Sequence, residues 1–261
     1  MILVVDVGNT NTLLGLIDGD TITETWRIST GRRTTDELGT LALQLLGHRG
    51  ICAADVTGAI CSSVVPSQVY TVQKAFRLYL QVECLQVGRG LKTGMRIRTD
   101  NPREIGADRI VNAVGALDRY TGPVVVVDLG TATTFDAVDA RGDYVGGVIA
   151  PGLRISEEAL FDRTAQLPRV ELARPSTVIG KNTVHAMQSG LLYGYAGLVD
   201  ALVTRIKAEL DPVARCVATG GYASLVSEVS DNVDVVDPTL TLWGLAVLYR
   251  RNEPSASTRT R

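Results

Sequence analysis

The sequence predicts an α/β protein made of two similar lobes, each with a mixed sheet flanked by helices. Two distant segments repeat one pattern, Ile2-Leu-Val-Val-Asp6-Val-Gly-Asn-Thr-Asn-Thr12 and Val124-Val-Val-Val-Asp128-Leu-Gly-Thr-Ala-Thr-Thr134. In each, aliphatic residues predict a short buried strand, an Asp follows near its carboxyl end, and a Gly opens a turn rich in hydroxyl or amide groups. Strands and helices alternate after both segments, which is typical of α/β architecture.

The first half continues with a hairpin and then alternates between helices and strands. A helix is expected from Thr35, because Asp36 and Glu37 suit its first turn and leucines recur on one face, while Pro66 ends the next strand. In order, the expected elements are strands over 13–17 and 21–28 joined by a turn at 18–20, the helix from 35, a strand over 59–65 and a helix over 68–80.

The second half repeats this opening. We expect a strand after Pro123, a partner over 134–138, a turn at 140–143, a strand over 144–149, helices over 155–167, 182–210 and 224–230, a strand over 215–219 and a closing helix over 240–249. Ligands of such sheets bind at the carboxyl ends of the strands. Both Asp-x-Gly turns lie there, so they are the first candidates for a functional site.

Length and composition are those of an ordinary globular enzyme. A chain of 261 residues with 45% hydrophobic and 21% charged residues can bury a large core. The net charge of −2 provides no basic field for nucleic acid or an anionic membrane. No apolar run reaches the roughly 18 residues of a membrane helix, and Met1 leads directly into a strand, so we expect a cytoplasmic protein. The polar tail over 251–261 is expected to be disordered.

The cysteines give no sign of a metal or redox site. No C-x-x-C pair occurs among the four cysteines, Cys52, Cys61, Cys84 and Cys216. The chain also has only two histidines, which disfavours a zinc cluster. We therefore expect buried structural thiols.

Both Asp-x-Gly turns have the chemistry of a phosphate and metal site. A carboxylate at a strand end can hold hydrated Mg²⁺, and Gly8 and Gly130 let the backbone approach a phosphate closely. The alternative is structural, with Asp capping a turn and Gly supplying a positive φ. Two copies in the same order favour function, with a nucleoside triphosphate as ligand. Neither a P-loop nor a Rossmann fingerprint is present, and Gly220-Gly221 is too short for either.

Further motifs identify a family resemblance. In order with the two repeats, Asp100-Asn-Pro-Arg-Glu-Ile-Gly-Ala-Asp-Arg-Ile-Val-Asn112, Gly146-Gly-Val-Ile-Ala-Pro-Gly152 and Gly180-Lys-Asn-Thr183 closely resemble type III pantothenate kinase. The resemblance implies two ribonuclease-H-like lobes of the actin-like, sugar-kinase-like superfamily, over 1–118 and 119–250. It also implies transfer of the ATP γ-phosphoryl to pantothenate, the first step of coenzyme A biosynthesis.

The resemblance assigns the pantothenate site. Asp108, at the start of a helix that would favour its ionised form, matches the general base that takes the proton of pantothenate's primary hydroxyl. Gly106, Ala107 and Arg109 would line the pantothenate pocket together with Asp108. The alternatives are a helix cap for Asp108 and a surface ion pair of Arg109 with Glu104.

The resemblance also assigns the ATP and cation sites. Asp128 matches the carboxylate that holds a monovalent cation, K⁺ or NH₄⁺. Thr183 matches a pantothenate contact from the neighbouring subunit of a homodimer, with a helix cap as the alternative. The ATP contacts, in which Asp6 orients Mg²⁺, would be Asp6, Val7, Gly8, Asn9, Thr10, Asn11, Thr12, Leu13 and Thr131.

One segment departs from the family pattern. Many members carry Tyr shortly before the Pro of the pantothenate motif, where this chain has Arg98-Thr-Asp-Asn-Pro102. Substrate packing is therefore expected to differ there, although the catalytic residues are intact. Because relatives have been described as Bvg accessory factors, a nucleotide-binding regulator without kinase activity is the rival function. A phosphatase or a kinase for another small alcohol is a further rival.

Overall fold

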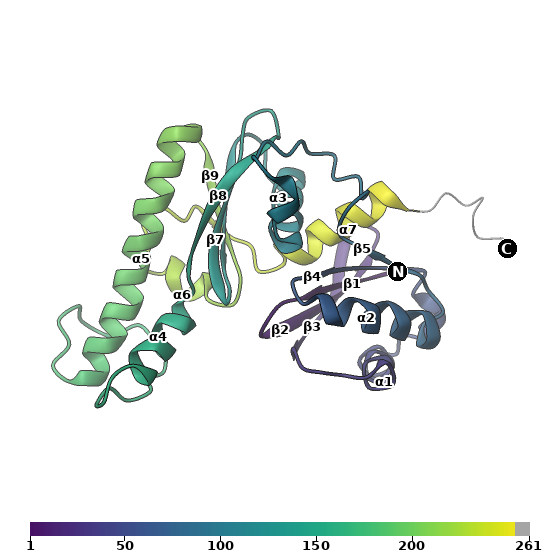
Figure 1. Ribbon diagram of the computed structural model, residues 1–261, viewed down its shortest axis with the longest axis horizontal. Coiled ribbons are helices and arrows are strands. Elements are labelled where there is room, and N and C mark those ends of the chain that lie inside the picture. Colours follow the sequence, from purple (N-terminus) through teal and green to yellow (C-terminus); the bar gives the residue numbers. More distant parts are fainter. Residues whose placement is uncertain (254–261) are drawn as a thin grey trace. The chain divides into compact units, whose positions relative to one another are not determined.

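Two compact units make up the part of the chain that the computed structural model describes, residues 1–253 (Figure 1). The first unit contains Met1–Gly94, Arg103–Asp118 and the residues from Leu240 onward, and the second contains Met95–Pro102 and Arg119–Thr239. The chain therefore returns to the first unit after completing the second. Residues 254–261, most of the predicted disordered tail over 251–261, lie outside the described residues, whereas Arg251 and Asn252 at its start are helical.

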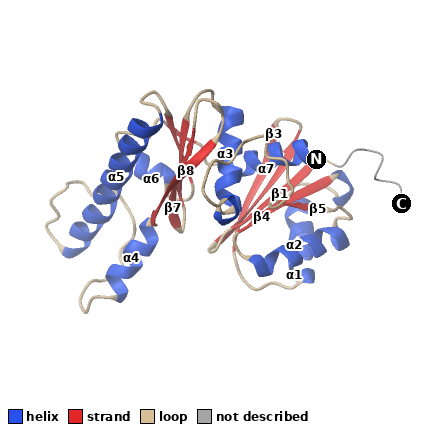
Figure 2. Ribbon diagram, turned by 45° about the horizontal axis from the view of Figure 1, so that its top comes forward, coloured by secondary structure: helices blue, strands red, loops and turns tan. Residues whose placement is uncertain are grey.

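The first unit is built on a five-stranded mixed sheet. Its elements are β1 Ile2–Val7, β2 Asn11–Asp18, β3 Thr21–Ser29, α1 Thr35–Gly47, β4 Gly58–Ser63, α2 Pro66–Tyr79, β5 Cys84–Gln86, α3 Ala107–Arg119 and α7 Leu240–Asn252. The strand order is β3-β2-β1-β4-β5, with β1 antiparallel to β2 and parallel to β4. Helices α1 and α2 cover one face through Leu46 and Phe76, whereas α7 packs on the other, where Leu242 meets Gly15 (Figure 2).

Local sequence explains how these helices begin and pack. The Thr34 hydroxyl accepts a hydrogen bond from the Glu37 N–H at 3.2 Å, and the Glu37 carboxylate accepts one from the Thr34 N–H at 2.7 Å. This reciprocal cap confirms the predicted helix start at Thr35. Helices α3 and α7 meet at glycines, since a Cβ added at Gly115 would lie 3.0 Å from the Gly244 nitrogen.

The second unit repeats the arrangement of the first. Its elements are β6 Val124–Leu129, β7 Ala132–Val138, β8 Tyr144–Pro151, α4 Leu153–Asp162, α5 Thr183–Leu210, β9 Arg215–Thr219, α6 Ala223–Ser227 and β10 Val235–Val236. The strand order is β10-β9-β6-β7-β8, with β6 antiparallel to β7 and parallel to β9. Helices α4, α5 and α6 pack on one face through a core that includes Leu153, Leu192 and Val226. The predicted fold class, two α/β lobes with mixed sheets, is confirmed.

Two helices end several residues earlier than the sequence predicts. The helix expected over 224–230 is α6, which ends at Ser227, and α4 shows the larger difference. The expected span was 155–167, whereas α4 ends at Asp162. The Thr164 hydroxyl donates to the Leu160 carbonyl at 2.8 Å and accepts from the Leu167 N–H at 3.3 Å, which replaces the next helical hydrogen bonds. The short strands β5 and β10 were not predicted, because two or three residues carry too little periodicity.

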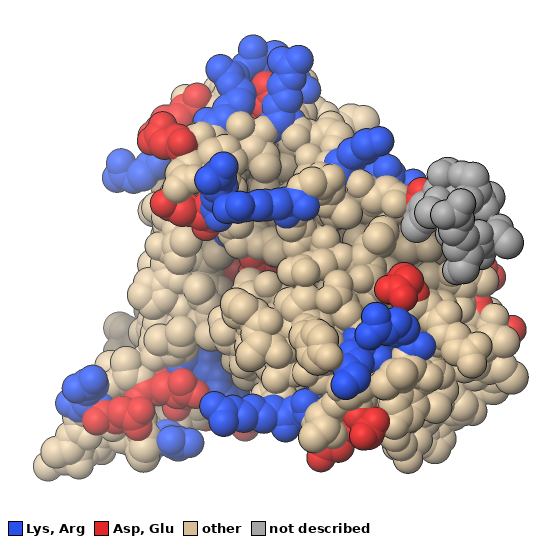
Figure 3. Space-filling model, turned by 45° about the vertical axis from the view of Figure 1, so that its right-hand side comes forward, with Lys and Arg blue, Asp and Glu red and all other residues tan. Residues whose placement is uncertain are grey.

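Two features of the surface correct or extend the sequence analysis. Cys52 is exposed beside the surface turn Ala53–Asp55, so the prediction of four buried thiols is wrong for this residue and confirmed for the other three. Among residues 1–253, no helix is long and apolar enough to span a membrane. On the face drawn in Figure 3, basic and acidic side chains are interspersed.

Candidate functional site

The first Asp-x-Gly turn is a tight backbone turn at the carboxyl end of β1. The Gly8 N–H donates to the Asn11 carbonyl oxygen at 3.0 Å, and a Cβ added at Gly8 would lie 2.9 Å from that oxygen. A side chain at position 8 would therefore strain the turn. Asn9, Thr10 and Asn11 are exposed on it, and their amide and hydroxyl groups are donors suited to phosphate oxygens.

The other predicted phosphate-loop residues support this turn. Val7 is buried in the core of the first unit. The Thr12 hydroxyl shares a hydrogen bond of 2.9 Å with the Thr30 hydroxyl. Leu13 is half-buried and pairs with Asp6 in the β1–β2 ladder. These side chains support the turn, while the exposed polar groups belong to residues 9–11.

Asp6 is half-buried near the end of β1, and Ser62 of the parallel neighbour β4 holds its carboxylate. The Ser62 hydroxyl donates to Oδ1 of Asp6. Burial raises the pKa of Asp6 to about 6, although the Ser62 hydrogen bond opposes this rise, and the charge of Asp108 adds to it. Asp6 and Asp108 thus lie within electrostatic reach of each other in the first unit.

Asp108 lies in the first turn of α3, as expected. Its Oδ1 accepts a hydrogen bond from the Arg109 N–H at 2.9 Å. A Cβ added at Gly106 would lie 2.5 Å from the same oxygen, so glycine leaves room for the carboxylate. Burial raises the pKa of Asp108, while the backbone N–H and the charge of Arg109 oppose the rise. A carboxylate with a raised pKa is a better proton acceptor than an exposed one.

The second Asp-x-Gly turn, at the end of β6, is packed more closely than the first. Asp128 is half-buried between two glycines, since a Cβ added at Gly130 or Gly220 would lie 3.4 or 2.5 Å from its Oδ1. Thr131 is exposed on the turn. Gly152 packs against the Thr131 carbonyl oxygen so closely that a Cβ would collide with it. Glycine is therefore required beside the Asp128 carboxylate in the second turn, and at the close backbone contact of Gly8 in the first.

Sequence reasoning missed two residues of these turns. Ser62 lies near the carboxyl end of β4, and adjacent parallel strands end at one edge of a sheet, so the polar pair Ser62-Ser63 was the available signal. Gly220 follows the buried strand β9 and adopts a φ of +93°. The Gly220-Gly221 pair matches no phosphate motif, so the sequence gives no signal for this residue, yet a Cβ added at Gly220 would lie 2.5 Å from Oδ1 of Asp128.

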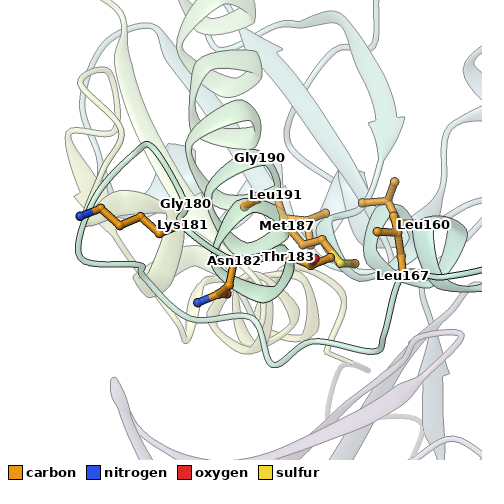
Figure 4. Close-up of a pocket in the computed structure, with 10 residues that line it drawn as sticks. Leu160, Leu167, Gly180, Lys181, Asn182, Thr183, Met187, Gly190 and Leu191 are labelled. Carbon is orange, nitrogen blue, oxygen red and sulfur yellow. The ribbon is translucent and has the colours of Figure 1, made fainter.

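A groove with a volume of about 640 Å³ lies at the start of α5, with an apolar wall of Leu160, Leu167, Met187 and Leu191 (Figure 4). Thr183 lines this groove, whereas Asp128 and Thr131 do not. Lys181 extends away from the apolar wall.

Asn182 caps α5, because its side chain accepts a hydrogen bond from the His185 N–H at 2.9 Å. The alternative that made Thr183 the helix cap is therefore wrong. Thr183 is instead the first helical residue and is exposed. Its hydroxyl is not required for capping and can therefore make the predicted contact with pantothenate.

The segment that departs from the family pattern belongs to the second unit. Arg98 lies 3.8 Å from Asp139 and 3.9 Å from Asp143, and its N–H donates to the Tyr144 carbonyl at 2.8 Å. The Thr99 hydroxyl is buried and has no hydrogen-bond partner within residues 1–253. A short buried polar side chain thus stands in the segment where the sequence departs from the expected pattern.

The sequence matches known proteins over nearly its whole length. Residues 2–205 match the family model of type III pantothenate kinase. The chain is 54% identical to a type III pantothenate kinase of Myxococcus xanthus, over 98% of this chain and 100% of that protein. It is 52% identical to one of Geobacillus kaustophilus, over 97% of this chain and 98% of that protein.

Solved structures with a similar fold are more distant in sequence. A Campylobacter jejuni structure described as a Baf family transcriptional activator is 17% identical, with a TM-score of 0.59, over 96% of this chain and 98% of that one. The activator of 2-hydroxyisocaproyl-CoA dehydratase from Clostridium difficile, with bound ADPNP, is 15% identical, with a TM-score of 0.52, over 97% and 94% of the chains. At these identities the likeness shows a shared fold alone.

The raised pKa of Asp6 predicts how an Asp6→Asn substitution changes stability with pH. The pKa is about 6 in the folded protein against an ordinary 3.8. The stability that Asp6 contributes is therefore complete below its unfolded pKa and is lost as pH rises through about 6. We expect Asp6→Asn, without ligands, to raise the thermal midpoint at about pH 8 and to leave it unchanged at about pH 4. An equal shift at both pH values would contradict this account.

Proposed function

The chain belongs to the type III pantothenate kinase family, and on that premise we propose which of its residues perform the reaction. The enzyme transfers the γ-phosphoryl of ATP to pantothenate and forms 4′-phosphopantothenate, the first step of coenzyme A biosynthesis. The observation that carries the residue assignment is that the first unit holds two half-buried carboxylates, Asp6 at the end of β1 beside a tight turn with exposed donors and Asp108 in the first turn of α3. Such an arrangement suits a phosphate donor next to an alcohol acceptor.

Asp108 acts as the general base. Its carboxylate accepts the proton from the primary hydroxyl of pantothenate as that oxygen attacks the γ-phosphorus. Burial supports this role because it raises the pKa of Asp108 toward the working pH. Gly106 and Ala107 form the backbone wall of the pantothenate pocket, and Arg109 offers charge-assisted hydrogen bonds to the substrate carboxylate.

ATP binds to the turn over residues 8–11, supported by Val7, Thr12 and Leu13, with Thr131 as a further contact. Asp6 would hold Mg²⁺ beside this turn. The fit is supported by charge, since a cation near Asp6 would offset its repulsion with Asp108. Mg²⁺ in phosphoryl-transfer sites needs only one or two carboxylates and keeps several waters. When bound, the ion supplies positive charge to the phosphate oxygens, and the protein residues supply position.

Asp128 would hold a monovalent cation, K⁺ or NH₄⁺. Support comes from its geometry, because a Cβ at position 130 or 220 would lie 3.4 or 2.5 Å from Oδ1, and glycine at both positions avoids these contacts. A cation held there would add positive charge next to the turn that carries Thr131, which is assigned to ATP.

The enzyme works as a homodimer in which Thr183 contacts the pantothenate of the neighbouring subunit. Support comes from the surface near the start of α5, where Val178 and Ile179 are 63% and 82% exposed. The same helix carries Gly190, Gly194 and Gly197, which are exposed and have open space beyond their Cα atoms. Small residues on one helix face allow a second helix to approach closely, and exposed apolar groups gain stability when covered.

Substituting Asp108 tests the catalytic assignment. Asp108→Asn keeps the size of the side chain and removes the proton acceptor, so we expect kcat to fall about 10²- to 10⁴-fold. Binding of ADP, measured by calorimetry, should be retained. Asp18→Asn, at an exposed hairpin turn of the same unit, is the matched control and should keep full activity. If Asp108→Asn keeps its turnover, Asp108 is not the general base.

Exchange of the monovalent cation tests Asp128. Release of ADP that depends on pantothenate should be high in K⁺ or NH₄⁺ and collapse in Na⁺. In Asp128→Asn the rate in K⁺ should drop to the rate in Na⁺, because the ligand is lost while the fold is kept. If K⁺ still stimulates Asp128→Asn, the cation binds elsewhere in the protein and Asp128 is not its ligand.

Mixed dimers test the shared site. Each of Asp108→Asn and Thr183→Ala should be nearly inactive alone, whereas co-refolded mixtures should regain activity. If Thr183 serves the neighbouring subunit, one site of each mixed dimer combines an intact Asp108 with an intact Thr183. A mixture that remains inactive, with mixed dimers present by native mass spectrometry, would place both residues in the same subunit's site.

A further inference from the structure

Tyr195 of α5 carries a hydroxyl within the core of the second unit. Its side chain is 6% exposed and belongs to the core that α5 forms with the sheet. The hydroxyl donates to the carbonyl oxygen of Pro151 at 2.8 Å and is hydrogen-bonded to the hydroxyl of Thr133. One tyrosine thus connects the long helix to two adjacent strands.

The directions of these hydrogen bonds follow from the number of protons. A tyrosine hydroxyl has one proton, and Tyr195 donates it to Pro151. The Thr133 hydroxyl must therefore donate to the Tyr195 oxygen. The result is a chain that runs from Thr133 through Tyr195 to the Pro151 carbonyl, and hydrogen bonds in such a chain strengthen one another in a buried site.

The two anchored residues flank the Gly130–Thr131 turn. Thr133 pairs with Leu129 across the β6–β7 hairpin that contains the turn. Pro151 is the last residue of β8 and pairs with Ala132. Gly152 follows directly and contacts the carbonyl oxygen of Thr131 with no space for a Cβ. A shift of the Pro151 peptide would therefore be passed to the backbone of Thr131.

We propose that Tyr195 is a positioning residue for ATP, which holds the Gly130–Thr131 turn in its binding conformation through Thr133 and Pro151. This inference rests on the proposed assignment of Thr131 as an ATP contact. Filling of the core does not explain the hydroxyl, because a phenylalanine would fill nearly the same volume without placing a polar atom in the core. The hydroxyl is the part of the side chain that makes the directional connections.

The test is Tyr195→Phe, which removes one oxygen and both hydrogen bonds. We expect KM for ATP to rise about 3- to 10-fold, as for the loss of one net hydrogen bond, with KM for pantothenate changed less than about twofold. The matched control is Tyr193→Phe on the same helix, whose half-buried hydroxyl donates to the Pro175 carbonyl at 3.4 Å. It should change neither KM.

Two further variants separate this proposal from the assignment on which it rests. Thr133→Val removes the first donor of the hydrogen-bond chain and should raise KM for ATP but not KM for pantothenate. Added to Tyr195→Phe, the same substitution should raise KM for ATP by a smaller factor than it does alone. Thr131→Ala should raise KM for ATP by itself. If Thr131→Ala has no effect, the ATP assignment fails. If Thr131→Ala raises KM for ATP but Tyr195→Phe does not, or if Tyr195→Phe raises both KM values equally, Tyr195 is structural and the proposal is overturned.

Discussion

A carboxylate at the end of each central strand is the constraint on which the rest of both units depends. Asp6 and Asp128 each follow a buried run of aliphatic residues in a strand that has an antiparallel neighbour on one side and a parallel neighbour on the other. The antiparallel partner is reached by a short turn, so backbone amides lie beside the carboxylate. The space there is so limited that Gly8, Gly152 and Gly220 cannot carry a Cβ without a close contact.

Holding acidic groups in this position lowers stability in the absence of ligands. The pKa of Asp6 is raised to about 6 and that of Asp108 is raised as well, which means that folding disfavours their ionised forms at neutral pH. The apolar packing of α1 and α2 against the sheet, and the glycine contact between α3 and α7, offset this cost. Functional sites commonly retain such local conflicts because the same charges serve substrate binding and proton transfer.

Features encoded within a few residues were predictable. The capping box of Thr34 and Glu37, the two opening hairpins and the helix that begins at the Gly106-Ala-Asp-Arg motif all follow from periodicity and short-range hydrogen bonding. The end of α4 was not predictable. The Thr164 hydroxyl takes the place of a helical N–H as the donor to a backbone carbonyl, and the hydrophobic pattern of the sequence does not reveal this. Likewise Asn182 rather than Thr183 caps α5, since both residue types can cap a helix and only the backbone decides which one does.

The sequence by itself determined the order and type of the longer elements, the two Asp-x-Gly turns and the family to which the chain belongs. Tertiary structure decided which distant residues surround those turns. Ser62 reaches Asp6 because β4 pairs with β1, Gly220 reaches Asp128 because β9 pairs with β6, and α7 joins the first unit after the chain has built the second. The physical reason is that hydrophobic periodicity is written locally, whereas the choice of neighbouring strands depends on burying both faces of a whole sheet at once.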